Sequence, residues 1–66
     1  MKNDGQIDVL RRELNTARIM AGALFEKYAN KHENEKAAVF DIMKTSLERY
    51  EVYCQELLTE GVQQDE

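Results

Sequence analysis

Apolar residues recur along the first half of the chain at alternating spacings of three and four. They are Ile7, Leu10, Leu14, Ala17, Ala21, Leu24 and Tyr28. A second series with the same alternation contains Phe40, Met43, Leu47, Tyr50, Cys54 and Leu57. This spacing places each series on one stripe of an α-helix, as at positions a and d of a coiled coil. The pattern therefore predicts two amphipathic helices and an all-α fold.

The two series are out of phase with each other. Continuing the first one would place Lys31, Glu35 and Thr45 on its stripe, and these residues make a poor apolar seam. The break falls within "KYANKHENEK", residues 27–36, which is the most polar stretch of the chain. We therefore predict an antiparallel helical hairpin, with a helix over about 4–30, a turn near 31–34 and a helix over about 35–60.

The two stripes also suggest a register for the hairpin, because facing residues of antiparallel helices have a constant index sum. The predicted pairs are Ile7–Leu57, Leu10–Cys54, Leu14–Tyr50, Ala17–Leu47, Ala21–Met43, Leu24–Phe40 and Tyr28–Lys36, and the two numbers in each add up to 64. Small residues face large ones in the central layers, which keeps the core volume even. The twelve residues of the first six pairs are the predicted core and dimer contacts.

The ends of the helices carry candidate capping residues. Asn3 followed by Gln6 resembles a capping box, and Gly61 suits a C-terminal cap. Asn30 or Asn34 is expected to adopt the left-handed conformation at the turn or to cap the second helix. We therefore expect a single domain over residues 1–60 and a disordered tail over 61–66.

Two helices alone cannot cover all the apolar residues of this chain. Beside the predicted seam, at positions e and g, lie Met20, Phe25, Val39, Tyr53 and Leu58. They widen the apolar stripe in the way that a bundle core requires. We predict that two hairpins associate as a homodimeric four-helix bundle with twofold symmetry. Residues 1–31 carry a net charge of +2 and residues 33–66 carry −6, so helix 1 is expected beside helix 2 of the partner subunit.

Three apolar residues lie off the predicted seam and have no role in it: Ile19, Ile42 and Val52. If they stay exposed in the dimer, they mark a surface for another protein. The leading hypothesis is therefore a small regulator or inhibitor that acts through protein–protein interaction. A structural oligomerisation module is a further alternative. Gly22, in the middle of the first helix, fits either an exposed position or the close approach of another helix or a ligand.

Composition narrows the class of protein further. The chain has 66 residues, one cysteine and a net charge of −4. It contains no apolar stretch long enough to span a bilayer, so we expect a cytoplasmic protein without a membrane or small-molecule partner. His32 at the turn and Cys54 in the second helix are roughly 33 Å apart along a helix, so no thiol site is expected within one subunit. We expect no enzymatic activity, metal or cofactor.

Polar residues of the first helix provide an alternative function. Arg11, Asn15 and Arg18 line one side of it, and Lys27 lies further along. The segment "LNTAR", Leu14 to Arg18, together with "LFEK" at residues 24–27 and a late cysteine, resembles the Rop family of plasmid RNA-binding regulators. That resemblance implies a helical-hairpin homodimer whose first helices bind RNA, here with Asn15 and Lys27 as contacts. In this RNA-binding alternative, Arg11 and Arg18 on the same side of the helix are further candidate contacts. The family has a Phe directly after the Arg, where this chain has Ile19.

Overall fold

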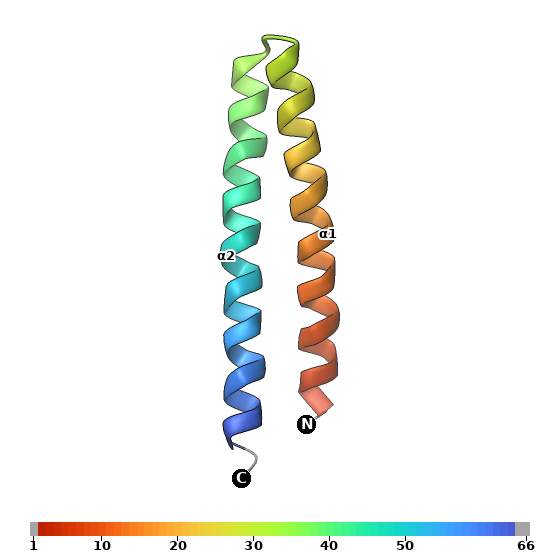
Figure 1. The fold of residues 1–66 in the computed structure, drawn as a ribbon, viewed down its shortest axis with the longest axis vertical. Coiled ribbons are helices and arrows are strands. Elements are labelled where there is room, and N and C mark those ends of the chain that lie inside the picture. The colour runs from red at the N-terminus through yellow and green to blue at the C-terminus, as the bar shows by residue number, and fades with distance from the viewer. Residues whose placement is uncertain (1, 65–66) are drawn as a thin grey trace.

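The computed structural model describes the backbone of residues 2–64 and the side chains of residues 5–60. Helix α1 spans Lys2–Asn30 and helix α2 spans Asn34–Gln64. The helices run antiparallel and lie side by side along their whole length, with both termini at the same end (Figure 1). The predicted all-α helical hairpin and the position of its turn are confirmed.

The turn ends α1 through a Schellman motif. His32 has the left-handed conformation, with φ of 63°. The Glu33 N–H donates to the Tyr28 carbonyl at 2.9 Å, and the His32 N–H donates to the Ala29 carbonyl at 3.0 Å. These bonds satisfy carbonyls that the end of a helix otherwise leaves without partners. The left-handed residue is therefore His32, and the prediction that Asn30 or Asn34 takes this role is wrong. Histidine is among the residues enriched in this conformation.

Burial shows that the facing register is shifted from the predicted one. The α1 residues that face α2 are Ile7, Arg11, Leu14, Arg18, Ala21, Phe25 and Tyr28. Their partners on α2 are Ala37, Phe40, Lys44, Leu47, Glu51, Cys54 and Leu58. We call these fourteen residues, all buried or half-buried, the hairpin seam. Position e thus replaces position d in both helices.

Particular contacts join seam residues of the two helices. Arg18 Nε donates to Glu51 Oε2 across the seam at 2.7 Å. The rings of Tyr28 and Phe40 stack with centroids 5.7 Å apart and planes inclined by 4°. Among the described side chains the most deeply buried are small, Ala21, Ala37 and Cys54. The small residues let the helices approach closely, but one hairpin encloses little apolar volume.

Both helices extend beyond their predicted ends. Because α1 begins at Lys2, Asn3 lies inside the helix, and the predicted capping box is wrong. Helix α2 continues through Gly61 to Gln64, so the predicted glycine cap is wrong as well. A glycine costs a helix only about 1 kcal/mol and does not by itself end one. Residues 65 and 66 of the predicted tail lie outside the described residues.

Gly22 lies beside the seam with room for a side chain. A Cβ at this position would lie 3.8 Å from Lys44 Cδ and 4.0 Å from Lys44 Cε, which is ordinary van der Waals contact. Within one chain, therefore, no close helix approach requires a glycine here.

We expect Gly22→Ala to stabilise the protein by about 1 kcal/mol, because alanine has the higher helix propensity and meets no clash. Urea unfolding at a fixed protein concentration measures this change. A loss of stability would show that another molecule or a second copy packs closely against Gly22.

Candidate interaction surface

One side of the hairpin carries a continuous row of apolar side chains. Leu10, Ala17 and Leu24 each precede a seam residue of α1 by one position, which turns them about 100° around the helix. Met43, Tyr50 and Leu57 precede seam residues of α2 in the same way. Because the helices are antiparallel, the same rotation in both brings the two rows to the same side of the hairpin.

Neighbouring residues widen these rows into what we call the apolar face. Its members are Val9, Leu10, Ala17, Met20 and Leu24 of α1 with Val39, Met43, Tyr50, Tyr53 and Leu57 of α2. Leu10 is 50% exposed, Met20 60% and Tyr53 59%. A shallow groove along α1 belongs to this side and is lined by Val9, Arg12, Glu13, Thr16, Ala17 and Met20. Half of the residues predicted as core thus lie on this face rather than in the hairpin seam.

The predicted protein-partner residues are exposed but do not form one patch. Ile19 is 58% exposed, Ile42 65% and Val52 57%. Ile19 and Val52 lie on different helices and point away from the apolar face, at position f of their heptads. Ile42 points away from α1, at the outer edge of the apolar face, and is roughly 15 Å from Val52 along α2. Each can therefore contact a partner only as part of a separate helix surface.

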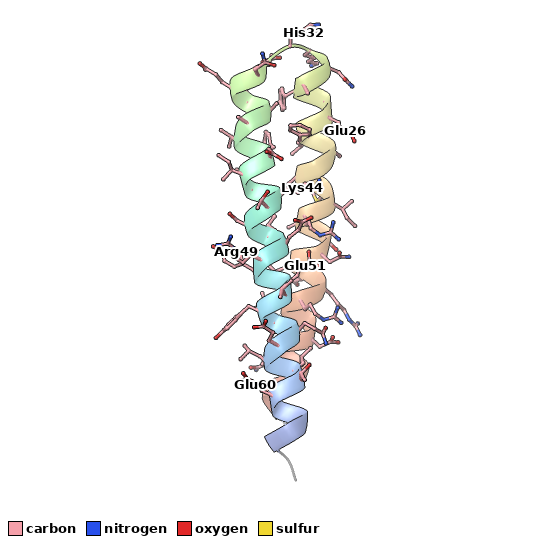
Figure 2. The ribbon with its side chains drawn as sticks, turned by 60° about the vertical axis from the view of Figure 1, so that its left-hand side comes forward. Glu26, His32, Lys44, Arg49, Glu51 and Glu60 are labelled. Carbon is pink, nitrogen blue, oxygen red and sulfur yellow. The ribbon has the colours of Figure 1, made fainter. Side chains whose placement is uncertain are left out.

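The predicted RNA-binding residues are largely occupied by contacts within the hairpin. Arg18 bonds Glu51 on the opposite helix and also donates to Asn15 Oδ1 at 2.6 Å. Arg11 donates to Asp8 at 2.7 Å, and this hydrogen bond is the main cause that lowers the pKa of Asp8. Figure 2 shows Glu51 on the side of α2 toward the neighbouring helix, whereas Arg49 points away. Arg18 therefore links the two helices, whereas Arg11 and Asn15 contact neighbouring residues of α1.

Lysines surround an aromatic ring at the turn. The ammonium groups of Lys27, Lys31 and Lys36 lie 5.7, 6.0 and 5.4 Å from the centroid of the Tyr28 ring. Lys36 also pairs with Glu33 at 2.8 Å. This hydrogen bond lowers the pKa of Glu33 and raises the pKa of Lys36, so both groups stay charged at neutral pH. Of the predicted RNA-binding residues, Lys27 is the exposed one.

The residues considered for chemistry remain apart. Cys54 is a buried thiol in the hairpin seam, and His32 is exposed at the turn. Within the described residues, no three His, Cys, Asp or Glu side chains gather in a way that could hold a metal ion. Nor is either helix, over the same residues, long and apolar enough to cross a membrane.

Sequence reasoning missed the placement of the e positions. The sequence did carry a signal for this placement, because Phe25, Ala37 and Leu58 occupy position e and Arg18 and Glu51, also at position e, have opposite charges.

Comparison with known proteins adds no relative: no family model, curated protein or solved structure matches this chain.

Proposed function

We propose that the protein is a non-enzymatic regulator that works as a homodimer, with two hairpins packed as a four-helix bundle. The observation that carries this proposal is the apolar face. Its ten exposed or half-buried residues run along one side of both helices, with Glu13 and Ser46 between them, and an apolar surface of this kind is typical of an interaction site.

The shape of the single hairpin supports association. Its extents are 53 × 14 × 10 Å, and its radius of gyration is 15.3 Å, against about 10.8 Å for a globular domain of this length. Its accessible surface is 5253 Å², against roughly 4,300 Å² for a globular monomer of this mass. A second hairpin on the apolar face removes exposed surface and encloses the apolar volume that one hairpin lacks.

The regulatory role rests on what such a dimer leaves outside. Ile19 and Val52 point away from the apolar face, so they stay exposed when a second copy covers it. Together with Ile42 they offer separate apolar contacts on the outer helix surfaces. A partner protein that recognises helix surfaces is therefore the target we favour. RNA binding is disfavoured because Arg11 and Arg18 are held by Asp8 and Glu51.

The experiment is a pull-down from the native host with and without RNase, followed by mass spectrometry. We expect a captured protein that survives RNase, and we expect Ile19→Glu combined with Val52→Glu to remove it without changing the dimer mass in light scattering. Glu48→Lys, a change at an exposed polar position of α2, serves as the control.

Loss of capture after RNase treatment would favour the RNA-binding alternative instead. In that case affinity for structured RNA should fall steeply with salt. Arg11→Ala combined with Arg18→Ala should weaken this affinity if these side chains contact phosphates.

A further inference from the structure

A groove on α2 lies outside both the hairpin seam and the apolar face. It is lined by five exposed residues, Val52, Gln55, Glu56, Thr59 and Glu60, and we call it the α2 groove. Val52 and Thr59 each follow a seam residue by one position, which turns them about 100° around the helix, to the side opposite to the apolar face. A second copy on the apolar face therefore leaves the α2 groove open. The grooves that include Met20 and Tyr50, in contrast, contain residues of the apolar face.

The α2 groove has the shape that a side chain of another helix fills. When helices pack, a side chain of one inserts into a hole between four residues of the other, which are spaced i, i+3, i+4 and i+7. Val52, Gln55, Glu56 and Thr59 have these spacings. Thr59 Oγ1 donates to the Gln55 carbonyl at 3.0 Å, so the hydroxyl is satisfied and the methyl group is available for contact. Both ends of the hole are short β-branched residues, which lose little side-chain freedom when the hole is filled.

The outer side of α2 differs from that of α1. Its four f positions between residues 34 and 60 carry no charge, whereas Arg12 and Glu26 occupy two of the f positions of α1. The four residues are Ala38, Thr45, Val52 and Thr59. Valine and threonine have a lower helix propensity than alanine, and at position f they gain no packing against α1. A contact outside the hairpin accounts for their presence.

The rim of the α2 groove is acidic. Glu56 and Glu60 are four positions apart on one helix, a spacing at which like charges destabilise the helix. Figure 2 shows Glu60 near the end of α2 farthest from the turn. Among the described side chains neither glutamate takes part in an ion pair, and the last turn of α2 carries no basic residue. A cation from another molecule relieves this repulsion, whereas an anionic partner such as RNA adds to it.

We propose that the α2 groove binds a basic amphipathic helix of a partner protein. An aliphatic side chain of that helix inserts between Val52 and Thr59, and its lysine or arginine residues lie beside Glu56 and Glu60. A helix provides both groups together, because residues three or four positions apart project from the same face. The inference rests on the proposed function and specifies the chemistry of the partner and the place where it binds.

Titration with synthetic peptides tests this chemistry. The first peptide has about 20 residues, long enough to form a helix, with leucines along one stripe and lysines on both sides of it. The second has glutamates in place of the lysines, and the third has serines in place of the leucines. We expect the first peptide to shift the backbone amide NMR signals of residues 52–60 of the full chain, and to bind about tenfold more tightly than the other two.

Other occupants give different results in the same titration. Equal affinity for the three peptides, or shifts confined to α1 or to the apolar face, would overturn the proposal. Shifts of residues 52–60 that grow with the concentration of the protein alone would assign the groove to a second copy of this chain. Tighter binding of structured RNA than of the first peptide at these residues would assign it to RNA.

Charge reversal in the groove has a matched control on the same helix. We expect Glu56→Lys to weaken binding of the first peptide about fivefold. Glu48 is also an exposed glutamate of α2 but does not line the groove, so Glu48→Lys should change the affinity less than about twofold. The comparison belongs at physiological salt, where exposed charges more than about 8 Å apart are largely screened. Equal effects of the two variants would show that the peptide responds to net charge, and the proposal would fall.

Two substitutions of Val52 test the sign of the partner's charge. Val52→Lys and Val52→Glu both remove the aliphatic end of the hole, but only the lysine repels a basic helix. We therefore expect Val52→Lys to weaken binding of the first peptide more than Val52→Glu does. The reverse order would contradict a basic partner.

The outcomes separate this inference from the proposed function. If the pull-down captures a protein that survives RNase, and Glu56→Lys captures it as well as the wild type does, the groove is not its site although the proposed function stands. If the peptides bind as expected but the pull-down yields only material that RNase removes, the role as a regulator of a protein fails while the specificity of the groove stands.

Discussion

Replacing Leu10 with glutamate is expected to convert the proposed homodimer into monomers. Leu10 lies on the apolar face and is 50% exposed in the single hairpin, so a second copy on this face buries it. Fully burying a leucine side chain contributes about 2 kcal/mol, so covering the exposed half contributes about 1 kcal/mol in each of the two copies. The lost burial alone raises the dimer dissociation constant roughly 30-fold, and the cost of removing two carboxylates from water adds to it. Sedimentation equilibrium over a concentration series measures the change.

Ile19→Glu is the matched control for this experiment. Ile19 lies on the same helix, is also aliphatic and is 58% exposed, but it points away from the apolar face. Its replacement should leave the dissociation constant within about twofold of the wild-type value. The apolar face would lose its assigned role if Ile19→Glu dissociated the dimer and Leu10→Glu did not.

Reversing the charge of Arg18 is expected to destabilise the hairpin itself. Arg18 and Glu51 form a cross-helix ion pair at 2.7 Å, with side chains 29% and 20% exposed. Arg18→Glu removes this pair and places two carboxylates near each other in a partly buried seam. We expect a loss of about 2–4 kcal/mol in the free energy of unfolding. Urea unfolding should be compared at one fixed protein concentration, because the proposed dimerisation contributes to the measured stability.

The exchanged pair Arg18→Glu with Glu51→Arg is the control. It restores opposite charges at the same two positions, so most of the lost stability should return, to within about 1 kcal/mol of the wild type. In the register first predicted from the sequence, Arg18 does not face Glu51. A change below about 0.5 kcal/mol for Arg18→Glu would therefore contradict the observed seam.

The helices and the turn were predictable because they depend on local patterns. Apolar residues at spacings of three and four specify helices, and the change of phase within residues 27–36 separates the two. The turn was placed correctly, whereas the residue with the left-handed conformation was not. Asparagine has the stronger general preference for this conformation. The hydrogen bonds to the Tyr28 and Ala29 carbonyls at the end of α1, however, require the left-handed conformation at position 32.

The interaction surface was predictable only in part. The pattern correctly identified more apolar residues than one hairpin can bury, but it placed Leu10, Met43 and Tyr50 between the helices. The structure exposes all three on the apolar face. Spacing alone cannot distinguish the stripe of positions a and d from the stripe of positions a and e. Both stripes contain position a, and both have alternating spacings of three and four.

The sequence by itself determined the two helices, the position of the turn and the surplus of apolar residues. These follow from periodicity and composition, which act within a few residues along the chain. Only the tertiary structure decided which edge of each helix faces the other. That choice depends on contacts between residues far apart in sequence, the Arg18–Glu51 ion pair and the close packing at Ala21, Ala37 and Cys54. It directs Arg11 and Arg18 into the hairpin seam and leaves the apolar face available for a partner.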